Sequence, residues 1–471
     1  MARDLRLFYL FRLLATSYLF VPVSVAYAIS RGLGFVEIGL LNTIYSLVVI
    51  LTEVPTGALA DRYGRRAAMT AGALAMVGSC GAFLFASTFT GFAIAQGLAA
   101  LSMTLCSGSD SAYLFDLLND RGRSDEYPRH EGTSSAWHQA GNTVAFAAGG
   151  LLGARDLALP FVATGFVAAA AAVVALGMRA DRRIAGRRGD LDVVPSSRRT
   201  RSGPSSQGEP GQVASVEPSR LLSVADYIGS MKDSFVTVAS KKQLLWAIGY
   251  STVVFVLLRA TIDVYQPYLK SAGYSIADTG LVFAAVYLVA AAVAHRADAL
   301  RHKVAEPVLL WGLLGTLAVT LLLLGGTTGP WCLVVLLVQA PANGLYSPLV
   351  KPLLNREIPE SQRRATVLSV ESMVRRMALG LVWPIIGGLM QAYGPSAGLT
   401  VCGLIGLVGM GILAATARAY VPGKAGRAPA VSPPGVLAVA GVVGVPGMSS
   451  TASVASTGAA TAAEPKSRNV V

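Results

Sequence analysis

Ionisable side chains within long apolar segments are the residues through which this sequence could do chemistry. Asp110 lies in the fourth such segment, and the seventh and eleventh segments hold pairs four residues apart. Arg259 with Asp263, and Glu371 with Arg375, are spaced to meet on one helix face. A charge in hydrocarbon costs several kcal/mol, so such residues persist where they are paired or face water. Carboxylates and guanidiniums that exchange partners suit proton or substrate binding.

Each of these groups also has a structural explanation. Arg259 and Asp263 could neutralise each other, and Glu371 could form a gating salt bridge with Arg375. Asp116 needs a different partner from Asp110 and could be a helix cap or a loop salt bridge. Charges that exchange partners between two conformations would couple protonation to movement. The predicted charge network consists of Asp110, Arg259, Asp263, Glu371 and Arg375.

Composition indicates that these residues lie within the spans of a polytopic membrane protein. Of the 471 residues, 53% are hydrophobic and 14% are charged, and the mean hydropathy is +0.55. The formal charge of +13 is concentrated in short loops between apolar segments. That bias is typical of the cytosolic loops of an inner or plasma membrane protein, so we exclude nucleic-acid binding. The predicted fold is all-α, with twelve transmembrane helices and both termini in the cytosol.

The predicted spans form two sets of six, because a span takes about 20 residues. Asp61 and Asp298 are almost as far apart in sequence as Gly149–Gly150 and Gly387–Gly388, which supports two six-helix pseudo-repeats. The spans are expected near residues 1–30, 36–60, 67–88, 91–118, 133–154, 158–178, 243–269, 276–296, 304–325, 329–355, 365–391 and 396–418. The expected domains are an N-terminal bundle (1–180), a cytosolic linker (181–240), a C-terminal bundle (241–420) and a disordered cytosolic tail (421–471).

Two segments have alternative interpretations. The first span has full membrane length, so we interpret it as one uncleaved helix and not as a signal peptide. Arg12 near its cytosolic end is explained either by snorkelling or by a role in a cavity. Apolar residues recur at helical spacing near the end of the linker. They indicate either an amphipathic helix on the membrane face or a lead-in to the next span.

The turn between the second and third spans holds a compact motif, formed by Gly57, Asp61, Arg62, Gly64, Arg65 and Arg66. Gly57 would let a neighbouring backbone approach, and Gly64 would permit a tight turn. Asp61 is predicted to be a buried carboxylate, held by the arginines, that latches adjoining helices. The alternative for the arginines is that they only fix the topology.

This motif resembles the loop signature of the major facilitator superfamily, and the hydropathy pattern extends the resemblance over about residues 1–420. The resemblance implies a secondary transporter whose two halves rock around a central cavity that binds a small molecule. Two family features are absent: Ala93 stands where a second signature has a membrane arginine, and residues 141–148 lack the proline of an exporter signature. The chain looks similar to bacterial drug-efflux-like members. We therefore expect proton-coupled export of a small amphipathic molecule, with import by symport as the alternative.

Polar residues within the spans are candidates for lining the cavity, or they could bridge helices. These candidates are Tyr18, Tyr45, Gln139, Asn142, Tyr265, Gln266, Asn343 and Tyr346.

Other function classes fit the sequence less well. An enzyme would need a catalytic acid, a metal or a nucleophile on a sizeable loop, but the outward loops are a few residues each, and the long inward linker has no His/Cys cluster or phosphate-binding motif. A membrane scaffold or lipid-handling protein remains a further alternative. Cys80, Cys106, Cys332 and Cys402 lack disulfide or metal spacing, so we expect them to be small core residues. We expect no metal or cofactor, and a monomer whose partners are a small-molecule substrate, protons and the lipid bilayer.

Overall fold

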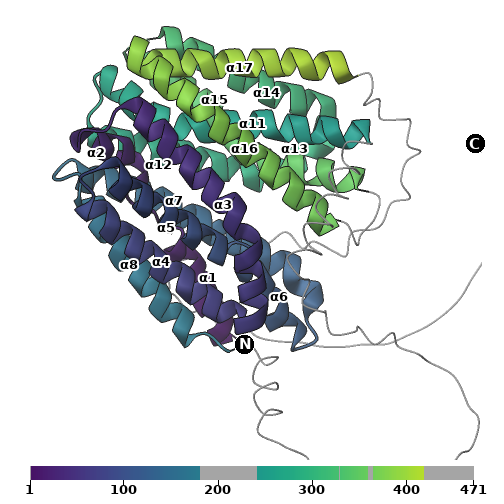
Figure 1. Ribbon diagram of the computed structural model, residues 1–471. Helices are drawn as coiled ribbons and strands as arrows, with labels where there is room; N and C mark the ends of the chain where they lie inside the picture. Colours follow the sequence, from purple (N-terminus) through teal and green to yellow (C-terminus); the bar gives the residue numbers. More distant parts are fainter. Residues whose placement is uncertain (1, 181–240, 328, 359–363, 418–471) are drawn as a thin grey trace, which may run out of the picture. The chain divides into compact units, whose positions relative to one another are not determined.

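The computed structural model describes residues 2–180, 241–327, 329–358 and 364–417 (Figure 1). We call the helices of residues 2–180 the first group. They are α1 (Ala2–Ala15), η1 (Val21–Val23), α2 (Ser24–Ser30), α3 (Phe35–Tyr63), α4 (Arg65–Phe85), α5 (Phe89–Cys106), α6 (Ser109–Asn119), η2 (Ser124–Glu126), α7 (Tyr127–Gly153) and α8 (Leu159–Gly177). The described helices after residue 240 form the second group, which consists of α11 (Lys242–Ser271), α12 (Ile276–His295), α13 (Ala297–Lys303), α14 (Glu306–Gly326), α15 (Trp331–Glu357), α16 (Arg364–Tyr393) and α17 (Pro395–Thr416). The predicted linker and tail lie outside the described residues.

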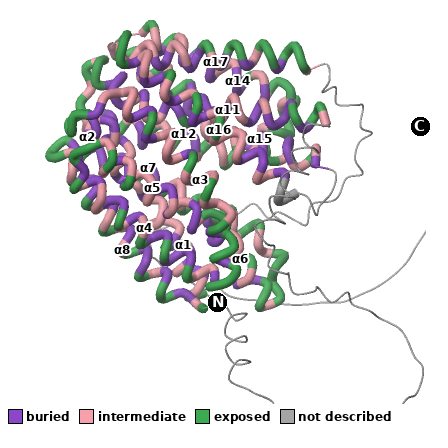
Figure 2. The backbone as a smooth tube through the Cα atoms, viewed as in Figure 1, coloured by how far each residue is buried: buried purple, intermediate pink, exposed green. Residues whose placement is uncertain are grey.

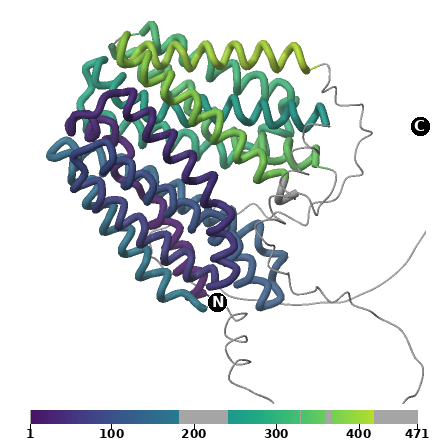
Figure 3. The backbone as a smooth tube through the Cα atoms, in the orientation of Figure 1, coloured from purple at the N-terminus to yellow at the C-terminus, as the bar shows by residue number. Residues whose placement is uncertain are grey.

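The expected all-α membrane fold is confirmed. Ten helices among the described residues are long and apolar enough to cross a membrane. The remaining two crossings are α7, whose N-terminal half is polar, and the first segment, in which α1, η1 and α2 follow one another. Figure 3 follows the chain through the first group, coloured purple to blue, before it enters the second group, coloured teal to yellow-green.

Helix ends follow from the local sequence. Gly64, with φ of +101°, separates α3 from α4 in a conformation that a side chain would strain. Ser275 caps α12, because its hydroxyl oxygen accepts from the Asp278 N–H at 3.1 Å while the Asp278 carboxylate accepts from the Ser275 N–H at 2.9 Å. Turn and capping residues therefore determine where these neighbouring helices end and begin.

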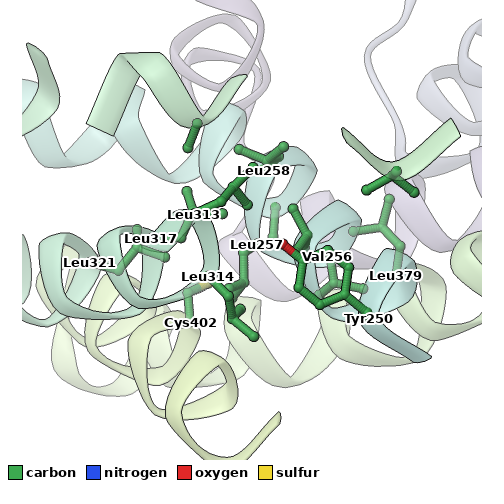
Figure 4. Packing of buried hydrophobic residues seen from close by; sticks show 14 of the residues in the cluster. Tyr250, Val256, Leu257, Leu258, Leu313, Leu314, Leu317, Leu321, Leu379 and Cys402 are labelled. Atoms are coloured by element: carbon green, nitrogen blue, oxygen red, sulfur yellow. The ribbon is translucent and has the colours of Figure 1, made fainter. Parts of the chain in front are cut away.

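The core of the second group is a leucine face of α14. Leu310, Leu313, Leu314, Leu317 and Leu321 recur at helical spacing and are buried. Figure 4 shows several of these side chains packed beside residues of α11 and α17. This packing positions α11, the helix on which several of the candidate functional residues lie.

Apolar side chains also cover the outer surface of the helices. Leu404, Val408 and Ile412 of α17 are exposed at a spacing of four residues, and Phe166 of α8 is exposed as well. Figure 2 shows exposed positions along the outward face of α17. Such stripes face hydrocarbon in a membrane protein.

Two predicted spans are broken and not continuous. The first span ends as a regular helix at Ala15, and Pro22 then occupies η1, so our expectation of one helix to Ser30 is wrong. The fourth span is interrupted by Ser107 and Gly108, and Gly108 has a φ of +80°. This second break makes Asp110 a helix N-terminal residue.

The two ends of the helices can be named by their turns. The Gly32 side has the turns at Gly32, Gly273 and Gly394, and the Gly64 side has the turns at Gly64 and Gly122. On the Gly64 side, α6 packs on α1, α4, α5 and α7, while α13 packs on α12 and α15. The elements of that side therefore pack within their own group.

On the Gly32 side, the two groups pack against each other. Gln266 of α11 donates to the Val21 carbonyl and accepts from the Val25 N–H, both at 2.9 Å. Helices α7 and α12 come so close that a Cβ on Gly150 would lie 2.5 Å from the Gly280 Cα. The structure is therefore closed between the groups on the Gly32 side.

Candidate functional site

Arg12 and Asp110 form an ion pair between α1 and α6. Arg12 lies in the last turn of α1 and Asp110 in the first turn of α6, so each charge also complements its own helix dipole. The two side chains are only 15% and 11% exposed. Asp110 also accepts a hydrogen bond from the Ser111 N–H at 2.7 Å. Pairing therefore accounts for Arg12 better than snorkelling does.

Further ionisable groups border this pair on α7. The Ser111 hydroxyl donates to Glu131 at 3.2 Å, and both Glu131 and His138 interact electrostatically with Arg12. One Glu131 carboxylate oxygen and the His138 Nδ1 are buried without a hydrogen-bond partner within the described chain. The first group thus has buried polar atoms on α7, near Asp110, that form no hydrogen bond with the described residues.

A second set of charges lies within the other group. The Glu371 and Arg375 side chains approach to 2.8 Å, as their spacing of four residues allows. Glu371, which is 4% exposed, also accepts a hydrogen bond from the Ser251 hydroxyl of α11. Arg375 donates to the Tyr346 hydroxyl of α15 at 2.9 Å. Side chains from three helices are therefore joined around one buried carboxylate.

The ion pair of Arg259 with Asp263, one of the two interpretations of their spacing, is not formed among the described residues. The Asp263 carboxylate instead accepts a hydrogen bond at 3.2 Å from Asn42 of α3, across the boundary between the groups. Arg259 is exposed and forms no ion pair with any described residue. The spacing of four residues permitted the pair, but Asn42 provides Asp263 with a partner from another helix.

The predicted charge network is consequently divided in this conformation. Asp110 pairs within the first group, Glu371 and Arg375 pair within the second, and Asp263 bonds across the boundary. Partner exchange among these sets stays a prediction about a second conformation.

The cavity candidates fall into two classes. Tyr265, Gln266 and Tyr346 bridge helices: the Tyr265 hydroxyl donates to Gln339, Gln266 binds η1 and α2, and Tyr346 binds Arg375. The remaining candidates make no side-chain hydrogen bond to any described residue, and these are Tyr18, Tyr45, Gln139, Asn142 and Asn343. The polar groups of this second class, which no described side chain occupies, are the ones among these candidates that a substrate could contact.

Arg65 ties the turn between α3 and α4 to α6. Its Nε lies 3.1 Å from the Asp116 carboxylate, and its Nη2 lies 3.6 Å from Asp61. The Asp61 side chain is 71% exposed at the end of α3, so our prediction of a buried carboxylate is wrong. A Cβ on Gly57 would meet no atom of a described residue within 4 Å, so the expected close backbone approach is absent from this part of the structure as well. The tight turn at Gly64 has the expected form.

The other arginines of this turn have separate contacts. Arg66 donates to the Met178 carbonyl at 3.1 Å, beyond the end of α8. Arg62 lies over the ring of Tyr63, 5.3 Å from its centroid. The motif therefore anchors the turn to α6 and α8 by Arg65 and Arg66.

We expect Asp116→Asn to destabilise the protein more than Asp61→Asn. Asp116 is 25% exposed and close to Arg65, whereas Asp61 is mostly in solvent. Exposed ion pairs contribute about 0.2–1 kcal/mol, and the half-buried Asp116 pair should contribute about 1–2 kcal/mol. Thermal unfolding of the two purified variants measures the difference. Equal or reversed losses would contradict the ranking.

A further charge contact lies outside the spans, in η2. The Arg123 side chain donates to Glu126 at 2.5 Å, and this bond lowers the pKa of the Glu126 carboxyl. Its contribution to stability is therefore present above the ordinary carboxyl pKa and is lost as the pH falls through the lowered value. Glu126 also lies 3.3 Å from His130, which contacts Tyr9 of α1. The loop is thereby tied to the first helix.

The comparisons with known proteins identify the family. The sequence profile of the Major Facilitator Superfamily matches residues 7–304. The chain belongs to this superfamily. It is 23% identical over 384 residues to an uncharacterized MFS-type transporter, YxaM, of Bacillus subtilis strain 168, covering 80% of this chain and 87% of the relative.

Solved structures agree in fold. The nucleoside transporter NupG has a TM-score of 0.68 at 10% identity, covering 88% of this chain and 98% of that chain. A D-xylose-proton symporter has a TM-score of 0.63 at 13% identity, covering 87% and 96%. Membership in the superfamily makes the chain a multi-pass membrane transporter of a small molecule and not an enzyme, and the twelve-helix fold agrees with it.

Three polar residues that bond to the candidate site residues were not predicted from the sequence. Asn42, Ser251 and Gln339 complete hydrogen bonds to Asp263, Glu371 and Tyr265. All three are uncharged polar residues within spans, and an inventory of such residues would have found them. Their partners follow only from how the helices pack. No described group of three His, Cys, Asp or Glu residues could hold a metal ion.

Proposed function

We propose that this transporter couples proton movement to the export of a small amphipathic molecule. The observation that supports coupling best is the bond from Asn42 to Asp263, because it joins the two groups on a carboxylate. Protonation weakens a charge-assisted hydrogen bond. A proton on Asp263 would therefore favour a conformation in which the groups separate there, which is what coupling to a two-state movement requires.

Charge distribution supports a cytosolic Gly64 side. Arg31, Arg155 and Lys270 lie at turns of the Gly32 side, whereas the Gly64 side has the arginine-rich turn after α3 and the basic end of α13. Cations favour cytosolic loops. Both termini would then be cytosolic, in the cell membrane, and the structure would be closed towards the outside.

The residues available to a substrate support an amphipathic one. Tyr18 and Tyr45 have apolar rings, their hydroxyls bond to no described residue, and they lie near the apolar Met76, Cys80 and Ala99. A molecule with an apolar body and a polar end would contact both kinds of surface.

Transport in inverted membrane vesicles tests the proposal. A panel of fluorescent amphipathic dyes of positive, zero and negative charge supplies the cargo. We expect an acid-inside pH gradient to drive accumulation of at least one dye, and Asp263→Asn to abolish the gradient dependence. Asp298→Asn is the matched control, because Asp298 is 87% exposed.

The same assay separates the alternatives. Gradient-driven uptake by whole cells, with none in inverted vesicles, would reverse the direction to import. Movement that ignores the gradient would contradict proton coupling. Transport of no dye in either preparation would favour a scaffold or lipid-handling role.

A further inference from the structure

Two arginines between the groups lack an acidic partner. Arg259 of α11 and Arg376 of α16 form no ion pair within the part of the chain that the structure describes. Arg376 donates to the Met103 sulfur of α5 at 3.7 Å, and a thioether is a weak acceptor. The Arg376 Nε is buried and has no hydrogen-bond partner among the described residues. Both guanidiniums therefore retain donors for another molecule.

The two arginines lie within electrostatic reach of each other. Arg376 interacts electrostatically with Arg259 and with Tyr45 of the first group. Arg259 interacts in the same way with Tyr18 of the first group and Tyr287 of α12. Tyrosines of both groups therefore lie within electrostatic reach of these cations, and the contact of Arg376 with Met103 of the first group places Arg376 at the boundary.

The nearby carboxylates do not neutralise these arginines by direct contact. Asp263 bonds to Asn42, and Glu371 is occupied by Arg375 and Ser251. Glu53 interacts electrostatically with Arg376 but forms no ion pair with a described residue. An unpaired cation at membrane depth costs several kcal/mol unless water or a ligand meets it.

The chemistry of the two side chains indicates what they bind. A guanidinium presents five N–H donors in a planar fork that matches a carboxylate or a phosphate. Tyrosine rings within electrostatic reach of the two guanidiniums suit an apolar, preferably aromatic, body. We propose that Arg259 and Arg376 bind the anionic end of the cargo, which is an amphipathic organic anion. This inference rests on the proposed transport function and narrows its substrate class.

Three probes of one shape test the charge preference on the purified full-length chain. They are 2-naphthoate, its neutral amide 2-naphthamide and the cation 2-naphthylmethylammonium, each titrated by calorimetry. We expect naphthoate to bind at least about tenfold more tightly than the other two, because only it can accept two charge-assisted hydrogen bonds from each guanidinium.

Two variants assign that preference to the arginines. Arg259→Gln or Arg376→Gln should weaken naphthoate binding by about 10- to 100-fold and leave naphthamide unaffected. Arg155→Gln removes an exposed cation from the turn between α7 and α8, and it should leave all three affinities unchanged. Thermal unfolding without ligand should occur at the same or a higher temperature in both site variants, since an unpaired cation adds no stability.

Several results would overturn the inference. These are equal binding of the three probes, no binding of naphthoate, or a naphthoate preference that survives both substitutions. A lower unfolding temperature with unchanged naphthoate affinity would assign the arginines a structural role. Gradient-driven transport of a cationic or neutral dye without an anion preference would overturn this inference and leave the proposed function standing. Arginine-dependent naphthoate binding without gradient-driven transport would contradict the proposed transport function and would support the anion site formed by the two arginines.

Discussion

Gly280→Ala should reduce gradient-driven transport by about 10- to 100-fold. A Cβ at Gly280 would lie 2.5 Å from the Gly150 Cα and 2.7 Å from the Phe146 carbonyl oxygen. Both are backbone atoms of α7, so neither can move aside as a flexible side chain would. Overpacking of this kind costs about 1–3 kcal/mol. A cost in the middle of that range lowers the population of the strained conformation by about 10- to 100-fold. The cost falls on the conformation that is closed on the Gly32 side.

Gly315→Ala is the matched control. A Cβ there would meet no atom of the described chain within 4 Å, and alanine is a better helix former than glycine by about 1 kcal/mol. Its transport should equal that of the wild type and its unfolding temperature should not fall. If Gly280→Ala and Gly315→Ala transport equally well, the close approach of α7 and α12 is not needed during the cycle.

Asp110→Asn should insert into the membrane but lose gradient-driven transport. The substitution leaves Arg12 largely buried without its carboxylate. Removing one partner of a buried ion pair costs about 3–5 kcal/mol, so a lower unfolding temperature is expected as well. Loss of transport alone would therefore not distinguish coupling from stability.

The double variant Arg12→Met with Asp110→Leu makes that distinction. Apolar residues that replace both partners often leave stability unchanged or raise it. We expect the double variant to unfold near the wild-type temperature and still to lack gradient-driven transport in vesicles. Gradient-driven transport by the double variant, or unchanged transport by Asp110→Asn, would remove Asp110 from the coupling role.

The sequence predicted the fold because membrane spans have a strong local signal. Length and hydropathy identify a span without knowledge of its neighbours. The cysteines followed from the same reasoning: Cys80, Cys332 and Cys402 are buried and unpaired, and Cys106 is partly buried. The helix breaks at Pro22 and Gly108 were harder to predict, because proline and glycine are tolerated within many membrane helices.

Partner choice was the part that sequence could not supply. Arg65 is four residues from Asp61 in sequence, yet it is closer to Asp116, because the break at Gly108 sets the position of α6. Likewise, Arg259 and Asp263 share a spacing that permits pairing, but Asn42 reaches Asp263 from another helix. Interactions across the boundary depend on packing between segments that are far apart in the chain.

The central claim, that the two helix groups open and close alternately on the Gly32 and Gly64 sides, is tested most directly by distances between spin labels. One pair of labels replaces Arg31 and Lys270 on the Gly32 side, and the other replaces Asp120 and Arg301 on the Gly64 side; all four positions are exposed. The background would have its native cysteines replaced by alanine. In proteoliposomes, a shift of pH or addition of a transported dye should lengthen one distance while it shortens the other. Distances that change together, or that stay fixed while transport proceeds, would contradict the claim.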